Sequence, residues 1–260
     1  ELPDMSGADR KSRAEANWAD AATSPARRDD GARFAYDVQV EYFREMKAYL
    51  RQLGLRIPVT CVVTSWVAPD VKSVADTLDF TAENVYWDHP AFEPGKEWQK
   101  PFYYANKDPL KTTNPWTMPP YSAVLKWRGK PVVVREWAAV WPNQFRASMV
   151  PLAAAYASFL DLDGMLAFTY TFRGAKLNDF AWERDPTRWG MMGLAAAMFH
   201  RRDIQPAADR VRIEWSDKAL FTWQDTLTDL YRLAWVSGLE NAPTGAPTDA
   251  GVALTLDGGV

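Results

Sequence analysis

A glutamate stands directly after a short run of buried-type residues in the segment KPVVVREWAAVWPN, residues 130–143. Three consecutive valines, Val132 to Val134, precede Arg135 and Glu136. A short β-branched run without alternation favours a strand covered on both faces, as in a parallel sheet. The carboxyl ends of such strands carry the chemistry of α/β barrels and open α/β sheets. Glu136 is therefore a candidate catalytic carboxylate. The alternative is a structural role, in which it ends a strand and pairs with a neighbouring base.

The sequence predicts three further strands, over 57–65, 79–86 and 164–171, beside the one over 131–136. Polar and aromatic side chains stand at or just after the ends of all four: Ser65, Trp66, Tyr86, Trp87, Asp88, His89, Glu136, Trp137, Trp141 and Tyr170. Aromatic faces stack on the C–H faces of sugars, and the chain holds thirteen tryptophans and ten tyrosines. We therefore expect the strand ends to form one concave mouth suited to a carbohydrate.

Several of these residues also have a structural interpretation. His89 precedes Pro90, as a turn residue would, and Asp88 is of a type that caps turns. The tryptophans can equally fill a core. Arg135 is adjacent to Glu136 on a strand, so alternation places its side chain on the opposite face and argues against it as a partner of the carboxylate.

Composition and charge limit the classes of protein and site. Of 260 residues, 47% are hydrophobic and 24% charged, which is a globular balance. A net charge of −3 without a basic block argues against a nucleic-acid partner. The single cysteine, Cys61, excludes an internal disulfide and a cysteine metal cluster, and two histidines argue against a histidine-rich metal site. No cofactor is implied, and no apolar run approaches the ~20 residues of a membrane helix.

Helices are expected between the strands. The most distinct covers 25–53, beginning after Ser24 and ending before Gly54. Its apolar residues recur at helical spacing on one face: Phe34, Val38, Tyr42, Phe43, Met46, Leu50 and Leu53. The remaining helices are expected over 70–77, over 121–127, from a cap at Asn143 to Phe159 with a kink or restart at Pro151, and over 190–200. Beyond residue 210, the stretches VRIEW and ALFTW alternate in polarity and predict short antiparallel strands.

This alternation is that of repeated βα units around a parallel sheet. A (β/α)8 barrel needs eight strands, so the expected fold is α/β, the C-terminal half of a (β/α)8 TIM barrel with strands five to eight, followed by the start of a small β segment. The chain would then comprise an irregular lead-in over 1–32, a half-barrel over 33–206, and a β-strand segment with a mobile tail over 207–260. A complete four-stranded open α/β domain is the alternative.

The first residue is Glu1 rather than methionine, so a fragment or processed product is expected. In that case the N-terminal half of the barrel is a missing partner. The compartment stays open, with secreted and periplasmic locations among the candidates.

The segments EYFREMKAYLRQLGLRIPVT, LDFTAENVYWDHPAF, KPVVVREWAAVWPN and MMGLAAAMFHRRDIQPA carry a resemblance. Over about residues 33–206, the chain resembles the C-terminal half of a clan A glycoside hydrolase barrel of the β-galactosidase or cellulase type. The resemblance implies that Glu136, at the end of strand seven, is the nucleophile of a retaining hydrolase. It also implies that Tyr86, at the end of strand six, lies within hydrogen-bond reach of that carboxylate.

The chain departs from the clan pattern at two places. Strand eight of the clan commonly offers a tryptophan as a sugar platform, whereas this chain has AFTYTF, with Tyr170 as the nearest substitute. The clan's acid/base glutamate follows an asparagine at the end of strand four, and no Asn-Glu pair precedes the 25–53 helix.

Two hypotheses follow. The first is a glycoside hydrolase that cleaves a β-linked bond with Glu136 as nucleophile. Tyr86 would assist it, and the substrate would contact Trp66, Trp87, His89, Trp137, Trp141 and Tyr170. The second is a carbohydrate-binding or scaffold fragment of the same fold that lacks catalysis. A lyase barrel is a weaker third reading, because the strand ends offer no Schiff-base lysine or metal ligands. The sugar and its linkage are not encoded in these features.

Overall fold

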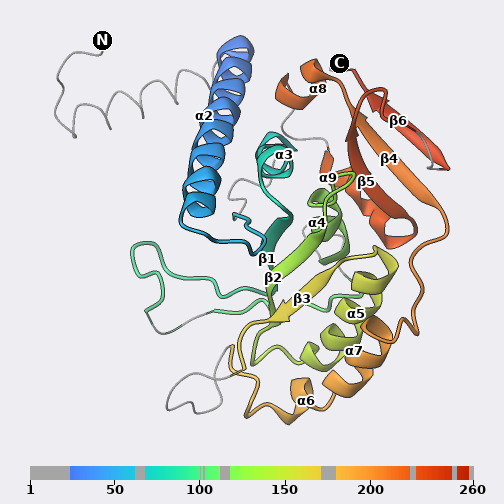
Figure 1. The fold of residues 1–260 in the computed structure, drawn as a ribbon. Helices are drawn as coiled ribbons and strands as arrows, with labels where there is room; N and C mark the ends of the chain where they lie inside the picture. Colours follow the sequence, from blue (N-terminus) through green and yellow to red (C-terminus); the bar gives the residue numbers. More distant parts are fainter. Residues whose placement is uncertain are drawn as a thin grey trace.

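The protein is described from a computed structural model, which covers residues 24–61, 68–99, 101, 103–111, 118–170, 180–222, 227–247 and 251–257. Within these ranges it is a mixed α/β structure with two three-stranded sheets. Figure 1 shows the first sheet in the centre of the molecule, with the second sheet beside it and α2 on the opposite side.

The first sheet holds the predicted strands. Its order is β1 (Thr81–Trp87), β2 (Val132–Ala139) and β3 (Gly164–Ala167), and both pairings are parallel. Three predicted strands, their parallel direction and their order along the chain are thereby confirmed, although β3 ends at Ala167 rather than at 171. The sheet does not close into a barrel within the described residues.

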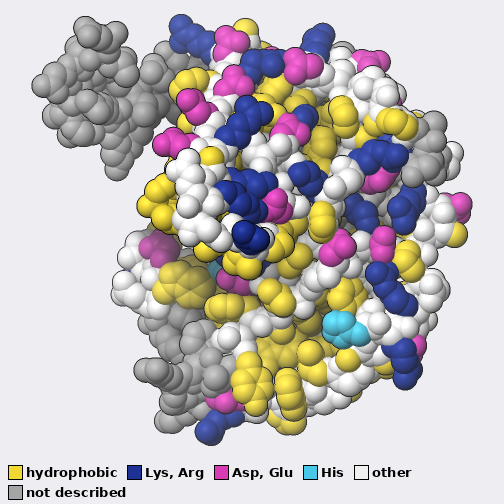
Figure 2. Space-filling view, in the orientation of Figure 1, with side chains coloured by type: hydrophobic (Ala, Val, Ile, Leu, Met, Phe, Trp, Pro, Cys, Tyr) yellow, Lys and Arg dark blue, Asp and Glu magenta, His cyan; other side chains and the backbone are white. Residues whose placement is uncertain are grey.

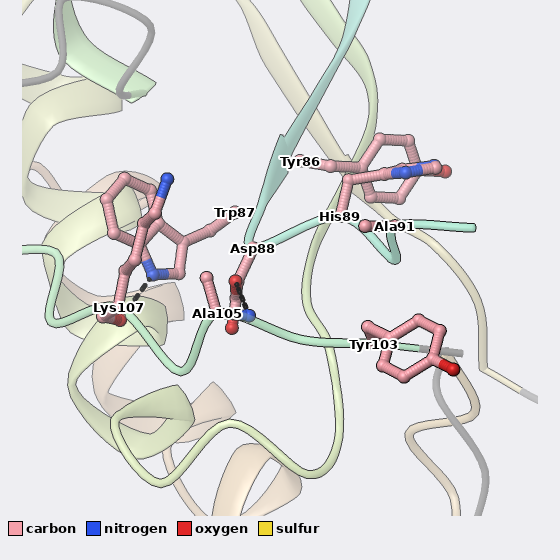
Figure 3. Close-up of a pocket in the computed structure, with 8 residues that line it drawn as sticks. All are labelled: Tyr86, Trp87, Asp88, His89, Ala91, Tyr103, Ala105 and Lys107. Atoms are coloured by element: carbon pink, nitrogen blue, oxygen red, sulfur yellow. Dashed lines mark hydrogen bonds between the residues drawn. The ribbon is translucent and has the colours of Figure 1, made fainter. Parts of the chain in front are cut away.

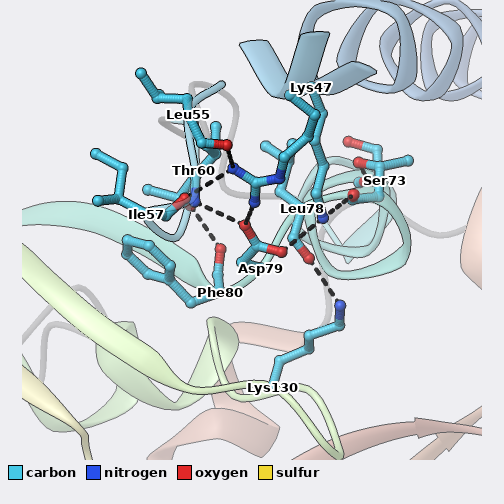
Figure 4. A network of polar contacts seen from close by, with 12 residues as sticks. Lys47, Leu55, Ile57, Thr60, Ser73, Leu78, Asp79, Phe80 and Lys130 are labelled. Carbon is cyan, nitrogen blue, oxygen red and sulfur yellow. Dashed lines mark hydrogen bonds and ion pairs between the residues drawn. The ribbon is translucent and has the colours of Figure 1, made fainter. Parts of the chain in front are cut away.

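The fourth predicted strand, over 57–65, lies partly outside the described residues. Residues 57–61 are not in a strand, although the backbone N–H of Asp79 donates to the carbonyl of Val59 at 2.9 Å. The side chain of Asp79 strengthens this junction, because it accepts from Lys47 at 2.6 Å, from Arg51 at 2.8 Å and from the Val59 N–H at 2.8 Å (Figure 4). The end of α2 and the segment after it are thus fastened to the start of β1.

Helices link consecutive strands and cover one face of the sheet. The elements between and beside them are α3 (Ala68–Thr77), α4 (Met118–Val124), α5 (Arg146–Phe159), α6 (Pro186–Trp189) and α7 (Met192–Phe199). Val132 and Val134 are fully buried against them, in a core with Val71 and Val150. Asn143 does not cap α5 directly: its Oδ1 accepts from the Phe145 N–H at 2.7 Å, and the helix begins one residue later.

The helix α2 (Pro25–Gln52) begins where predicted and ends one residue earlier, with Leu53 as its C-cap, but it does not bury the predicted apolar face. Phe34 is 69% exposed and Val38 and Tyr42 are about half exposed, whereas Val40 and Phe43 are buried. Position 40 lies off the predicted stripe, so the helix meets its neighbours along a different line, and most of the apolar stripe faces outward. A contiguous exposed apolar surface of this kind is typical of a site that another chain segment or protein covers.

The expectation of antiparallel strands after residue 210 is wrong. β4 (Arg210–Trp215), β5 (Gly238–Pro243) and β6 (Val252–Leu256) form the second sheet in the order β5-β4-β6, and both pairings are parallel. Residues 219–222 of the ALFTW stretch lie in α8 (Asp217–Thr222) instead, and Trp223 lies outside the described residues. The first turn of α8 is capped by Ser216 Oγ, an acceptor for the Ala219 N–H at 3.0 Å. Together with α9 (Leu227–Tyr231) and η1 (Arg232–Trp235), this helix carries the chain back to the start of β5, so that β5 runs parallel to β4 (Figure 1).

Candidate functional site

The side chains of Tyr86 and Glu136 meet across two adjacent strands. The Tyr86 hydroxyl donates to Glu136 Oε2 at 2.5 Å, which confirms that the two are within hydrogen-bond reach. Tyr86 lies near the carboxyl end of β1, as expected. The expectation that Glu136 ends its strand is wrong, because β2 continues to Ala139 and Glu136 lies in its middle. The Glu136 side chain keeps 26% of its surface exposed, so the carboxylate is accessible to a ligand.

A β-bulge in β2 determines where Glu136 points. Val134 and Trp137 pair with Glu83 and Val85 of β1, so β2 has one residue more than its neighbour over this stretch. The pairing with β3 shows the same excess, because Val134 and Trp137 oppose Met165 and Ala167. The extra residue is therefore a property of β2 itself.

The bulge places two consecutive side chains on the same face of the sheet. Val134 and Trp137 both belong to the core shared with the helices. The two residues between them therefore lie on the other face, where Glu136 meets Tyr86. β-bulges commonly re-aim side chains beside active sites in this way.

Arg135 is consequently a neighbour of the carboxylate, and the expectation that it points to the opposite face is wrong. Its terminal nitrogen lies 3.6 Å from Glu136 Oε1, and its Nε donates to Asn84 Oδ1 at 3.1 Å. The strict alternation behind that expectation fails because the bulge adds a residue between two positions that face the helices. One oxygen of Glu136 thus meets a hydroxyl donor and the other faces a cation, surroundings that suit a charged carboxylate.

The ring of Tyr86 is held by three neighbouring rings. Phe180, His89 and Phe168 contact it edge-on, with centroid distances of 5.6, 5.7 and 6.1 Å. Burial among these rings raises the pKa of the Tyr86 phenol, and the hydrogen bond to Glu136 raises it further. The phenol therefore stays protonated and able to donate at any pH at which the protein would be assayed.

A buried ion pair fixes Phe180 and the end of β2 relative to each other. Arg188 is fully buried and donates to the carbonyl of Ala139, at the end of β2, at 3.1 Å and to that of Ala181 at 2.6 Å. Its Nε also donates to Asp185 at 2.8 Å. Burial alone would raise the pKa of Asp185, but hydrogen bonds and charges from Arg146 and Arg188 outweigh it and lower that pKa.

The end of β1 and the segment after it line a pocket of about 280 Å³. Tyr86, His89 and Tyr103 line it on one side, and Trp87 and Lys107 lie on the other (Figure 3). Asp88 joins the end of β1 to residues 105 and 106, because its carboxylate accepts hydrogen bonds from their backbone N–H groups at 3.0 and 2.8 Å. The turn-capping interpretation of Asp88 is the one that fits these contacts.

Two of the tryptophans expected to contact substrate are buried, although Trp87 also lines the pocket. Trp137 is 5% exposed and packs edge-on against Trp182 at 5.1 Å. Trp87 is also 5% exposed, and its indole packs with Ala139 and Met149 while donating to the Lys107 carbonyl at 2.9 Å. Both face the helix side of the sheet, opposite Glu136, which accounts for the difference.

The other predicted contacts are distributed unevenly. His89 lies beside Tyr86 and at the pocket, as expected, and its Nδ1 lies 2.9 Å from the carbonyl of Pro90. Tyr170 is exposed and its ring contacts Trp189, not the rings around Tyr86. Trp141 is half-buried just beyond β2, and its contact with a sugar stays a prediction. Ser65 and Trp66 lie outside the described residues.

Sequence reasoning missed several residues that the structure brings to this site: Asn84, Trp98, Arg135, Phe168 and Phe180. Phe168 is the first residue after β3, so a shorter strand in the AFTYTF stretch would have favoured it over Tyr170. Phe180 and Trp98 belong to loops that carry no periodicity, and only spatial proximity identifies them.

The surface and the remaining side chains provide little further indication of a ligand. On the face seen in Figure 2, lysine and arginine side chains are interspersed with aspartate and glutamate. Within the described part of the chain, no group of three or more histidine, cysteine, aspartate or glutamate side chains could hold a metal ion. In that same part, no helix has the length and apolar character needed to cross a membrane.

Comparison of the chain with protein-family models, curated proteins and solved structures gives no match. The site geometry is therefore the basis for a functional conclusion.

Proposed function

We propose that the chain carries the nucleophile of a retaining glycoside hydrolase that cleaves a β-linked glycosidic bond, and that this nucleophile is Glu136. The observation that carries the proposal is the arrangement around its carboxylate. A bulge in a buried strand presents Glu136 beside Tyr86 at 2.5 Å and Arg135 at 3.6 Å, with part of its surface open. A carboxylate nucleophile needs hydrogen-bond donors and cations of this kind around it.

The proposed chemistry has two steps. In the first, a Glu136 oxygen bonds to the anomeric carbon while the bond to the departing oxygen breaks, and a carboxylic acid protonates that oxygen. In the second, the same acid, now a carboxylate, takes a proton from water, which attacks the anomeric carbon and releases Glu136. Tyr86 orients the carboxylate before the attack and stabilises its charge again when it leaves the sugar.

We further propose that β1, β2 and β3 correspond to strands six to eight of a (β/α)8 barrel. Their parallel pairing in chain order supports this assignment. The exposed apolar residues of α2, such as Phe34 and Val38, also support it, because a neighbouring βα unit would cover them. The open α/β domain is the competing architecture.

One observation favours a second function, carbohydrate binding without catalysis. Retaining enzymes need two carboxyl groups about 5–5.5 Å apart. The clan's acid/base glutamate follows an asparagine, and no Asn-Glu pair precedes α2 in this sequence. An experiment that separates the two functions must therefore probe the nucleophile without requiring the acid.

Dinitrophenyl 2-deoxy-2-fluoro-β-glycosides meet this requirement. Their leaving group departs without protonation, and the fluorine slows release of the glycosyl-enzyme, so a competent nucleophile becomes labelled. The chain is incubated with the gluco, galacto, manno and xylo reagents, and the product is analysed by intact mass and peptide mapping. We expect one of them to add a single fluoroglycosyl group to Glu136.

Two variants serve as controls. Glu136→Gln should not be labelled, since an amide oxygen cannot act as the nucleophile, whereas Glu183→Gln, a change at an exposed glutamate, should label normally. Labelling of another carboxylate would reject Glu136 as the nucleophile. Absence of labelling by every reagent, together with measurable sugar binding, would establish the non-catalytic alternative.

A further inference from the structure

An exposed tryptophan lies at the end of an aromatic cluster that starts at the candidate nucleophile. Trp98 is 57% exposed. Its ring contacts Phe92 at 4.8 Å, His89 at 5.5 Å and Phe180 at 6.1 Å. His89 and Phe180 in turn contact the ring of Tyr86, whose hydroxyl reaches Glu136. Trp98 is thus two ring contacts away from Tyr86.

The backbone at Trp98 has a conformation that favours glycine. Its φ is +63°, and the Gln99 N–H donates to the Lys96 carbonyl at 3.0 Å, which closes a four-residue turn. Trp98 is the third residue of this turn, and a positive φ at that position is the pattern of a type II turn, where glycine or asparagine is usual. A bulky residue there is an outlier that a local packing role would not require.

The turn is held in place by the rest of the loop. Ala91 and Tyr103 form a two-way backbone bridge, with N–H to carbonyl distances of 2.8 and 3.0 Å. At the tip, the Glu93 carboxylate accepts from Lys96 at 2.5 Å and from the Tyr103 hydroxyl at 3.1 Å. The hydrogen bond from Lys96, followed by that from Tyr103, lowers the pKa of Glu93. These bonds fix described residues on both sides of the indole before any ligand binds.

We infer that Trp98 is the floor of an additional saccharide subsite, which takes a sugar unit beyond the one attacked by Glu136. This inference rests on the proposed function and specifies its substrate class as a β-linked oligosaccharide of two or more units. An exposed indole offers an apolar face to the C–H groups of a sugar ring. His89, which contacts Trp98 and lines the neighbouring pocket, supplies a polar group for the ring hydroxyls.

The test measures the gain in affinity from each added sugar unit. Glu136→Gln protein, which cannot turn substrate over, is titrated by calorimetry with mono-, di- and trisaccharides of β-linked glucose, galactose, mannose and xylose. In the series that binds, one added unit should raise the affinity. Trp98→Ala in the same background should reduce the affinity for the longer ligand about tenfold, the upper range for an aromatic contact, and leave the monosaccharide unchanged.

Further variants separate the subsite from a structural role. Trp98→Phe should retain part of the gain, and Tyr42→Ala, at an exposed aromatic residue of α2, should retain all of it. Trp98→Gly should keep the melting temperature close to that of the parent, because relief of the positive-φ strain offsets the lost ring contacts. A large fall in melting temperature with an unchanged affinity gain would overturn the inference in favour of a packing role.

Failure of the inference and failure of the proposed function give different results. If Trp98→Ala leaves the affinity gain intact, or if no oligosaccharide binds more tightly than its monosaccharide, the subsite is rejected. Labelling of Glu136 by the fluoroglycosides in the Trp98→Ala protein would show that the nucleophile assignment survives that rejection. If Glu136 is never labelled but Trp98→Ala abolishes the affinity gain from the added sugar unit, the subsite is confirmed and the protein binds sugar without catalysis.

Discussion

The hydroxyl of Tyr86 allows the sharpest test of the site, because it can be removed with little other change. Phe168, Phe180 and His89 pack against the aromatic ring, with ring planes nearly perpendicular to it. Within the described part of the chain, the hydroxyl makes one hydrogen bond, to Glu136. In Tyr86→Phe the ring packing should persist, and the carboxylate should lose its closest donor.

The expected effect on rate is much larger than that on stability. A hydrogen bond to a charged group contributes about 1.5–3 kcal/mol, and each ~1.4 kcal/mol of barrier is tenfold in rate. If the bond orients the attacking carboxylate, labelling by the reactive fluoroglycoside should slow by about 10- to 100-fold. Because Glu136 is 26% exposed, water can replace the lost donor in the unliganded protein, so the unfolding free energy should fall by about 1 kcal/mol or less.

The assay follows the labelled fraction by intact mass at several reagent concentrations, together with Tm by calorimetry. Since burial raises the pKa of the Tyr86 phenol, the ratio of wild-type to variant rates should stay constant up to about pH 9, below the ordinary tyrosine pKa of about 10. A Tyr86→Phe protein that labels at the wild-type rate would refute the positioning role. A protein that loses several kcal/mol of stability would show that the hydroxyl serves the fold.

Two further predictions concern the polar networks that support the site. Asp79→Asn should lower Tm at neutral pH, and the difference from wild type should shrink as the pH falls. Burial alone would raise the pKa of Asp79, but its hydrogen bonds with Lys47 and Val59 and nearby charges lower that pKa. The stabilisation from Asp79 is therefore present above its unfolded-state pKa and is lost as the pH falls through its folded-state pKa. A difference that stays constant in thermal scans from pH 7 to pH 3 would contradict this. Asp185→Asn should lower the free energy of unfolding in urea by about 3–5 kcal/mol, because Arg188 would remain buried without a carboxylate partner at this position. A loss below about 1 kcal/mol would disprove the role of Asp185 as the counter-charge of Arg188.

The parallel sheet was predictable chiefly from β2, whose apolar run carries two fully buried valines. The unbroken run at Val132 to Val134 identifies this strand without any alternation, and the structure buries Val132 and Val134 completely. The turn residues and the helical spacing between strands then determine the βα order. These signals are local, so a single sequence is sufficient to locate the elements.

The face that a helix buries is not a local property. The apolar stripe of α2 that includes Phe34 and Val38 has the correct period, yet the helix packs through Val40 and Phe43. Periodicity gives the orientation of side chains around the axis, but the neighbours select which line is covered. The ALFTW stretch is a similar case, since its alternation fits a strand while the Ser216 cap starts a helix.

The site itself depends on one such non-local feature. Alternation assigns Arg135 and Glu136 to opposite faces, and a regular strand would have left the carboxylate without a nearby cation. The extra residue in β2, counted against both neighbouring strands, gives both side chains the same face. The stretch VVVREW does not indicate a bulge, because it contains no glycine or proline. The same irregularity that made Arg135 unpredictable places its guanidinium beside Glu136, so the local departure from regular geometry and the candidate chemistry share one physical origin.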